Sequence, residues 1–120
     1  MTFNEIDGVI GTFSKRYCSK RVADFLEEHK ILYIPDFGKL YCGIGQFTES
    51  SIPVHDAILA LHDKNIEVYA IHNNKSDNWD LYVENMWREK SNKPINTFSD
   101  YLDAVNAGLD YVVEHYWDLI

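Results

Sequence analysis

Two glycines follow a short apolar run near the middle of the chain, in the sequence Gly43-Ile44-Gly45. Serines at positions 50 and 51 and a segment with helical spacing come next, which is the element order of a nucleotide-binding loop. A full fingerprint needs a third glycine, where this chain has Thr48, and an acidic residue after the next strand, where it has two asparagines. A glycine kink in a strand explains the motif better, and a small nucleotide-binding protein or enzyme stays an alternative.

The two cysteines and five histidines show no spacing typical of a metal site or an activated nucleophile. Cys18 and Cys42 are far apart and form no C-x-x-C pair, so we expect reduced structural thiols. No two histidines have the one-, three- or four-residue spacing that brings two ligands to one metal. A cysteine hydrolase built from Cys42 with His72 or His55 lacks any local feature that would activate the thiol. The sequence predicts no catalytic residue, no cofactor and no metal.

The carboxyl-terminal segment, residues 98–120, has the clearest helical spacing in the chain. Its apolar residues recur every three or four positions and so share one face: Phe98, Leu102, Val105, Leu109, Val112, Tyr116 and Leu119. The opposite face carries a row of carboxylates with an aromatic residue on each flank. The row consists of Asp103, Asp110, Glu114 and Asp118, with Tyr111 and Trp117 beside it.

The last two carboxylates of this row stand where local stability disfavours them. Glu114 and Asp118 are four residues apart near the end of the predicted helix, where mutual repulsion and the helix dipole each cost a few tenths of a kcal/mol. Aromatic rings among carboxylates suit an arginine-rich surface, through stacking, cation–π contact and charge-assisted hydrogen bonds. We therefore predict that these six residues form a partner-binding surface; the plainer alternative is a solvated face that keeps the protein soluble.

The charge of the chain favours a basic protein partner. Its 11 basic and 19 acidic residues give a net charge of −8, which repels nucleic acid phosphates and anionic membranes. Residues 94–120 contain no lysine or arginine, whereas Lys15, Arg16, Lys20 and Arg21 lie within seven positions. Direct nucleic-acid binding by this basic cluster is the weaker interpretation. The sequence does not determine whether the acidic and basic segments meet.

The other segments predict the elements that position the last helix. Residues 3–17 have helical spacing behind a capping box, and Ser19 caps a second helix that includes residues 22–29. A third helix begins near Pro53, and Asn65 ends it in a left-handed conformation. Strands are predicted at residues 31–34, 40–44, 66–72 and 79–84, followed by irregular or helical chain to residue 88. Thr97 is the predicted cap of the last helix.

Together these elements predict a single α+β domain over residues 1–120. It would contain a small mixed or antiparallel sheet of about four strands, covered by helices, with a long amphipathic carboxyl-terminal helix. No apolar run approaches the roughly 20 residues that span a bilayer, and the amino terminus does not resemble a signal peptide. A cytoplasmic location is the expectation.

The leading functional hypothesis is a non-enzymatic acidic protein that binds another protein. It would act as an inhibitor that covers a basic, nucleic-acid-binding surface, as an immunity protein does for a nuclease toxin or a phage anti-defence protein does for a host nuclease. The first alternative is a regulatory or assembly module that forms homo-oligomers through Trp79, Tyr82, Trp87 and Trp117. The second is the nucleotide-binding protein or enzyme built on Gly43-Ile44-Gly45.

Overall fold

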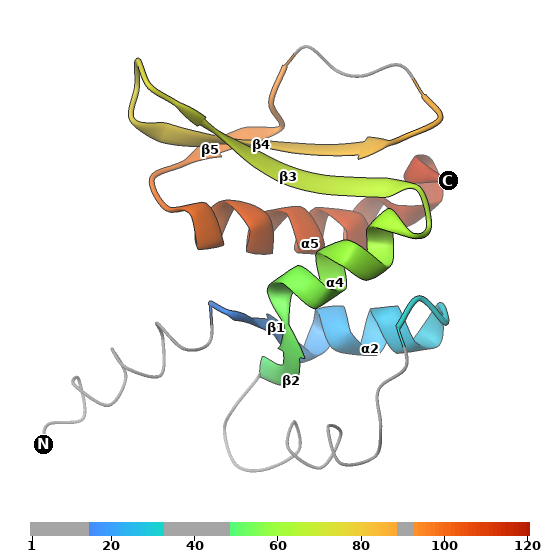
Figure 1. The fold of residues 1–120 in the computed structure, drawn as a ribbon. Coiled ribbons are helices and arrows are strands. Elements are labelled where there is room, and N and C mark those ends of the chain that lie inside the picture. The colour runs from blue at the N-terminus through green and yellow to red at the C-terminus, as the bar shows by residue number, and fades with distance from the viewer. Residues whose placement is uncertain (1–14, 33–48, 89–92) are drawn as a thin grey trace, which may run out of the picture.

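The computed structural model describes residues 15–32, 49–88 and 93–120 (Figure 1). The elements in this part of the chain are β1 (Tyr17–Ser19), α2 (Lys20–Glu28), β2 (Glu49–Pro53), α4 (Val54–His62), β3 (Ile66–Asn73), β4 (Asn78–Asn85), β5 (Asn96–Phe98) and α5 (Tyr101–Leu119). The strands form two antiparallel sheets, one of β1 and β2 and one in the order β3-β4-β5. The predicted α+β class and long last helix are confirmed, and the predicted count of about four strands is approximate.

The larger sheet is built on a regular hairpin. β3 and β4 pair along their whole length, from Ile66 opposite Asn85 to Asn73 opposite Asn78, which confirms the two strands predicted here. Asn65 lies before β3 with a φ of 68°, as predicted for the left-handed residue after α4. β5 pairs only with the first part of β4, where Phe98 lies opposite Trp79.

Helix α5 lies across one face of this sheet (Figure 1). Gly108 is the point of closest approach. A Cβ atom on this residue would lie 2.5 Å from Val68 Cγ1 and 2.9 Å from Leu81 Cδ1, so a side chain here would force these neighbours to shift. The glycine therefore lets the helix backbone rest directly on the inner side chains of β3 and β4.

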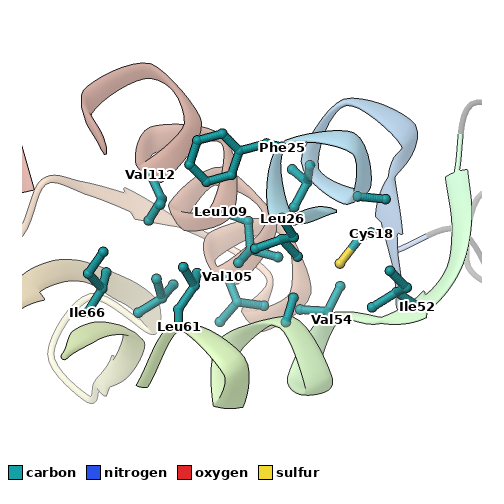
Figure 2. Packing of buried hydrophobic residues seen from close by; sticks show 14 of the residues in the cluster. Cys18, Phe25, Leu26, Ile52, Val54, Leu61, Ile66, Val105, Leu109 and Val112 are labelled. Atoms are coloured by element: carbon teal, nitrogen blue, oxygen red, sulfur yellow. The ribbon is translucent and has the colours of Figure 1, made fainter. Parts of the chain in front are cut away.

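The core lies between the helices and the inner face of the larger sheet. Figure 2 shows part of it, with labelled side chains from both sheets and all three described helices: Cys18, Phe25, Leu26, Ile52, Val54, Leu61, Ile66, Val105, Leu109 and Val112. Burial, and then the charge of Asp56, raise the pKa of the Cys18 thiol to about 12. The thiol is therefore protonated at neutral pH, which agrees with the structural role predicted for Cys18.

The last helix begins later than the sequence predicts. Residues 96–98 form β5, so Thr97 and Phe98 belong to the sheet because pairing with β4 satisfies their backbone. The cap is Asp100 instead of Thr97, since a carboxylate oxygen of Asp100 accepts a hydrogen bond from the Asp103 amide at 3.1 Å. Sheet pairing thus outweighed the apolar spacing at the start of this segment.

The amino-terminal predictions have mixed outcomes. Ser19 caps α2 as predicted, with its hydroxyl accepting from the Val22 amide at 3.2 Å. Tyr17 belongs to β1, where it pairs with Pro53, so the predicted first helix does not reach residue 17. Its residues 3–14 lie outside the described residues, as does the predicted strand at residues 40–44.

Residues 31 and 32 form a bend instead of the predicted start of a strand. The amides of both residues donate to the Leu26 carbonyl and so complete the end of α2. Lys30, with a φ of 55°, turns the chain at this point. The remainder of that predicted strand, residues 33 and 34, is not among the described residues.

Candidate partner-binding surface

The acidic face of α5 meets part of the basic cluster. Lys15 Nζ lies 3.2 Å from Asp103 Oδ1, and the two guanidinium nitrogens of Arg21 lie 3.7 Å from Asp110 Oδ1 and 3.5 Å from Glu114 Oε1. The structure thus answers the question that the sequence left open, because the fold brings the start of α2 beside α5. Three of the four carboxylates in the predicted row have a cation of the same chain beside them.

These ion pairs lie on the surface. The side chains of Lys15, Arg21, Asp103, Asp110 and Glu114 are each about half exposed, so water screens the pairs and each contributes well under about 1 kcal/mol. Breaking these pairs would therefore cost little free energy. The two cations nevertheless reduce the negative potential along the helix face from Asp103 to Glu114.

The ionised form of Asp110 is disfavoured. Its partial burial raises the pKa of its carboxyl group; the Arg21 guanidinium acts in the opposite direction, and the charge of Glu114 adds a smaller increase. Burial and the neighbouring carboxylate together outweigh Arg21. The ionised form of Asp110 is thus less stable than that of an isolated aspartate.

Helix α5 is interrupted at His115. This residue has φ −120° and ψ 17°, outside the helical region, and its ring lies against that of Tyr111 at a centroid distance of 4.2 Å. In the turn that follows, the Tyr116 ring packs against Phe25 at 5.1 Å and His29 at 4.6 Å. The interruption therefore separates a final turn that packs against α2 from the longer part of α5 that packs against the sheet.

This final turn presents Trp117 and Asp118 to solvent. Trp117 is 74% exposed, yet its ring makes edge contacts with His29 at 5.7 Å and Tyr116 at 5.4 Å, so one side of the indole is fixed. The Asp118 side chain is 86% exposed, with one carboxylate oxygen 3.8 Å from His115 Nδ1. An anchored aromatic ring and an open carboxylate thus stand side by side in the sequence.

The end of β4 holds this turn in place. Asn85 Nδ2 donates to the Leu119 carbonyl at 2.5 Å, and Arg88 Nη1 donates to the Asp118 carbonyl. These bonds satisfy carbonyl groups that the helix itself leaves without a partner. They also place the exposed side chains that follow β4, of which Trp87 is 81% exposed, at the same end of the molecule as the carboxyl terminus (Figure 1).

We call this region the carboxyl-end surface and define it by Met86, Trp87, Trp117, Asp118 and Ile120. Four of these are among the seven large hydrophobic side chains that are exposed in the described part of the chain. Sequence analysis missed Met86 and Ile120, and it placed Trp87 only in a possible oligomer interface. Asn85 is the sequence feature that could have indicated a turn after β4. Its side-chain oxygen accepts a hydrogen bond from the Trp87 amide at 2.8 Å and turns the chain there.

The structure does not bring the six predicted site residues together on one surface. Glu114, Trp117 and Asp118 lie at or next to the carboxyl-end surface. Asp103 precedes Asp118 by 15 residues, which at about 1.5 Å per residue is roughly 22 Å along the helix. Tyr111 is half-buried and packs against the core, and Asp110 lies with Arg21 between the two ends.

Two aromatic residues of the proposed oligomer interface are engaged within the chain. The Trp79 ring stacks on Tyr101 at 5.1 Å, and the Tyr82 ring stacks on Tyr69 at the same distance. Trp79 packs at one end of the sheet, whereas Tyr82 lies on the face away from α5. The four residues named for that interface therefore do not form one surface.

The described residues contain no group of three or more histidine, cysteine, aspartate or glutamate side chains that could hold a metal ion. In the same ranges no helix is long and apolar enough to cross a membrane. The Gly43-Ile44-Gly45 motif and Cys42 lie in the segment that the structure does not describe. Comparisons with protein families, curated proteins and solved structures gave no match to this chain.

Proposed function

We propose that this chain is a non-enzymatic protein that binds a basic surface of a partner protein through the carboxyl-end surface, with Glu114 at its border. The observation that carries the proposal is Trp117, a large ring that is 74% exposed although its contacts with His29 and Tyr116 hold it in position. Tryptophan is highly buried on average, and exposed large apolar side chains that gather in one region are typical of binding sites.

The physical basis for affinity is burial of aromatic surface. Tryptophan is among the residues most enriched at energetic hot spots of interfaces, and a ring that is already fixed loses little conformational entropy on binding. Trp87, at 81% exposed, offers a second ring near the same end. Two such rings can supply the apolar centre of a small interface.

The basis for specificity is charge. Asp118 has an open carboxylate beside Trp117, and Glu114 can exchange its Arg21 contact for an arginine of the partner. The net charge of −8 attracts a basic surface over long range and raises the association rate. An inhibitor that covers the nucleic-acid-binding surface of a nuclease fits these properties, and we extend the proposal to such a partner in the cytoplasm.

The proposal is tested with the purified chain as bait for proteins of its source cell. The test compares the native chain with Trp117→Ala and Asp118→Lys at low and moderate salt. We expect recovery of a basic partner by the native chain and a loss of at least tenfold with either variant, since hot-spot residues contribute about 2 kcal/mol or more. Circular dichroism confirms that the variants remain folded.

Matched controls come from helix α4. Leu59→Ala removes another exposed large side chain. Asp56→Lys, in the first turn of α4, makes the same charge change as Asp118→Lys outside the carboxyl-end surface. Equal recovery by every variant would reject the carboxyl-end surface as the binding site. Light-scattering mass of the native chain separates a monomeric inhibitor from a homo-oligomer, whose mass would depend on concentration.

A further inference from the structure

The larger sheet has one face without a helix. α4 and α5 both lie on the inner side of β3 and β4, and no element in the described ranges covers the other side (Figure 1). Alternation along the strands sends a defined set of side chains to this outer side. We call the set the open sheet face: Glu67, Tyr69, Ile71, Asp80, Tyr82 and Glu84, of which Glu84 is itself buried.

The residues of the open sheet face form three cross-strand rows. Glu67 lies opposite Glu84, Tyr69 opposite Tyr82, and Ile71 opposite Asp80. Successive rows are about 7 Å apart, because two residues of a strand span that distance. The opposed carboxylates are each held by a neighbouring side chain, Glu67 by His62 and Glu84 by Tyr69. Ile71 is 53% exposed and contributes little to the stability of the sheet.

The central tyrosine pair is held in a fixed arrangement. The two rings stack at a centroid distance of 5.1 Å with planes inclined by 12°, and Tyr69 Oη donates to Glu84 Oε2 at 3.1 Å. Burial and the hydrogen bond to Glu84 raise the pKa of Tyr69 to about 12, so this hydroxyl remains a donor at neutral pH. Glu84 is only 7% exposed and acts as a support for the ring.

Two accessible carboxylates flank this pair. Glu67 is partly open and contacts His62, and Asp80 lies on the other side of the tyrosines, where Asn73 donates to it at 3.4 Å. β3, β4 and β5 contain three carboxylates and no lysine or arginine. A guanidinium group can stack on a tyrosine ring and donate to a neighbouring carboxylate at the same time.

We propose that the open sheet face binds an extended segment of a partner protein that carries arginine at alternate positions. Alternate side chains of an extended segment are about 7 Å apart, which matches the spacing of the rows. Each arginine would then meet a tyrosine ring or a carboxylate. A second copy of this chain does not suit this surface, because two open sheet faces in contact would bring carboxylates against carboxylates, which repel each other.

This surface lies apart from the carboxyl-end surface, and the inference does not depend on the function proposed above. The test is a titration of the isotope-labelled full chain with a synthetic peptide of alternating arginine and threonine, followed by NMR. A second peptide has the same composition with its three arginines consecutive. We expect saturable binding of the alternating peptide, with the largest chemical-shift changes in β3 and β4 and at least threefold weaker binding of the second peptide.

Three variants make the test specific. Asp80→Asn and Tyr82→Leu should each weaken the alternating peptide about threefold, the scale of one exposed ion pair or cation–π contact. Asp56→Asn removes one negative charge from the first turn of α4, away from both proposed surfaces, and should leave the affinity unchanged. Equal affinity for both peptides, shift changes that map to α5, or no effect of Asp80→Asn in a folded variant would each overturn the proposal.

Discussion

The two parts of helix α5 on either side of His115 have different surroundings. Before His115 the helix is bound to the sheet, with Leu109 and Val105 buried and with Asp103 beside Lys15. After His115 the final turn carries Trp117 and Asp118, both mostly exposed. The longer part therefore carries most of the stability of the fold, whereas the exposed side chains of the final turn contribute little to it.

The largest expected effect comes from the buried part. Leu109→Ala should lower the free energy of unfolding by about 2–5 kcal/mol, because it removes a core side chain and leaves a cavity. Leu109 is 1% exposed and belongs to the core shown in Figure 2. Urea unfolding measures the change. Trp117→Ala, measured in parallel, should lower the free energy of unfolding by less than about 1 kcal/mol. Equal losses from both substitutions would show that the two parts of α5 do not differ in their contribution to stability.

A second substitution examines the contact between helix and sheet. Gly108→Ala places a methyl group against Val68 and Leu81, and overpacking of this kind costs about 1–3 kcal/mol. Alanine recovers about 1 kcal/mol through helix propensity, so the net destabilisation should be smaller than that of Leu109→Ala. Thermal unfolding provides the measurement. A stabilised Gly108→Ala protein would mean that α5 can move away from the sheet without loss.

The third substitution compares the two ends of α5 directly. Asp100→Ala removes the cap and should cost about 1 kcal/mol, since the amide of Asp103 loses its acceptor. Asp118→Ala should be neutral or stabilising by a few tenths of a kcal/mol, because a negative charge at a carboxyl-terminal turn opposes the helix dipole. Urea unfolding at low salt resolves the difference. Equal effects would show that Asp118 has a structural role.

The fold was predictable wherever local pattern and tertiary pairing agree. Ser19 as a cap, Asn65 as a left-handed residue and the hairpin of β3 and β4 all follow from short-range chemistry. Phe98 was misassigned because its spacing fits the last helix, whereas pairing with Trp79 places it in β5. Such pairing depends on residues far apart in the sequence, so no local signal reveals it.

The candidate site was predictable in part for the same reason. Helical spacing placed Glu114, Trp117 and Asp118 correctly on one helix with a common exposed side. It could not show that Arg21 reaches this helix, that the helix is interrupted at His115, or that Trp87 lies at the same end. Each of these depends on how separate elements pack, which periodicity does not record.

The smallest expected effect concerns the pH dependence of Asp110, in the part of α5 before His115. Because its pKa is raised in the folded state above the ordinary 3.8, the folded chain binds this proton more readily than the unfolded chain. The Asp110 contribution therefore lowers stability as pH rises through the folded pKa, and this loss is reversed as pH falls towards 3.8.

The Asp110→Asn variant has no carboxyl group to titrate at this position. Urea unfolding of the native chain and of this variant, from pH 7 down to pH 4, therefore isolates the contribution of Asp110. The native chain should gain stability relative to Asp110→Asn as the pH falls, by a small amount because the carboxyl group is half exposed. Arg21→Met should enlarge the gain, since Arg21 acts to lower that pKa. A change in the opposite direction would mean that the ion pair with Arg21 outweighs burial and that the chain stabilises the ionised form of Asp110.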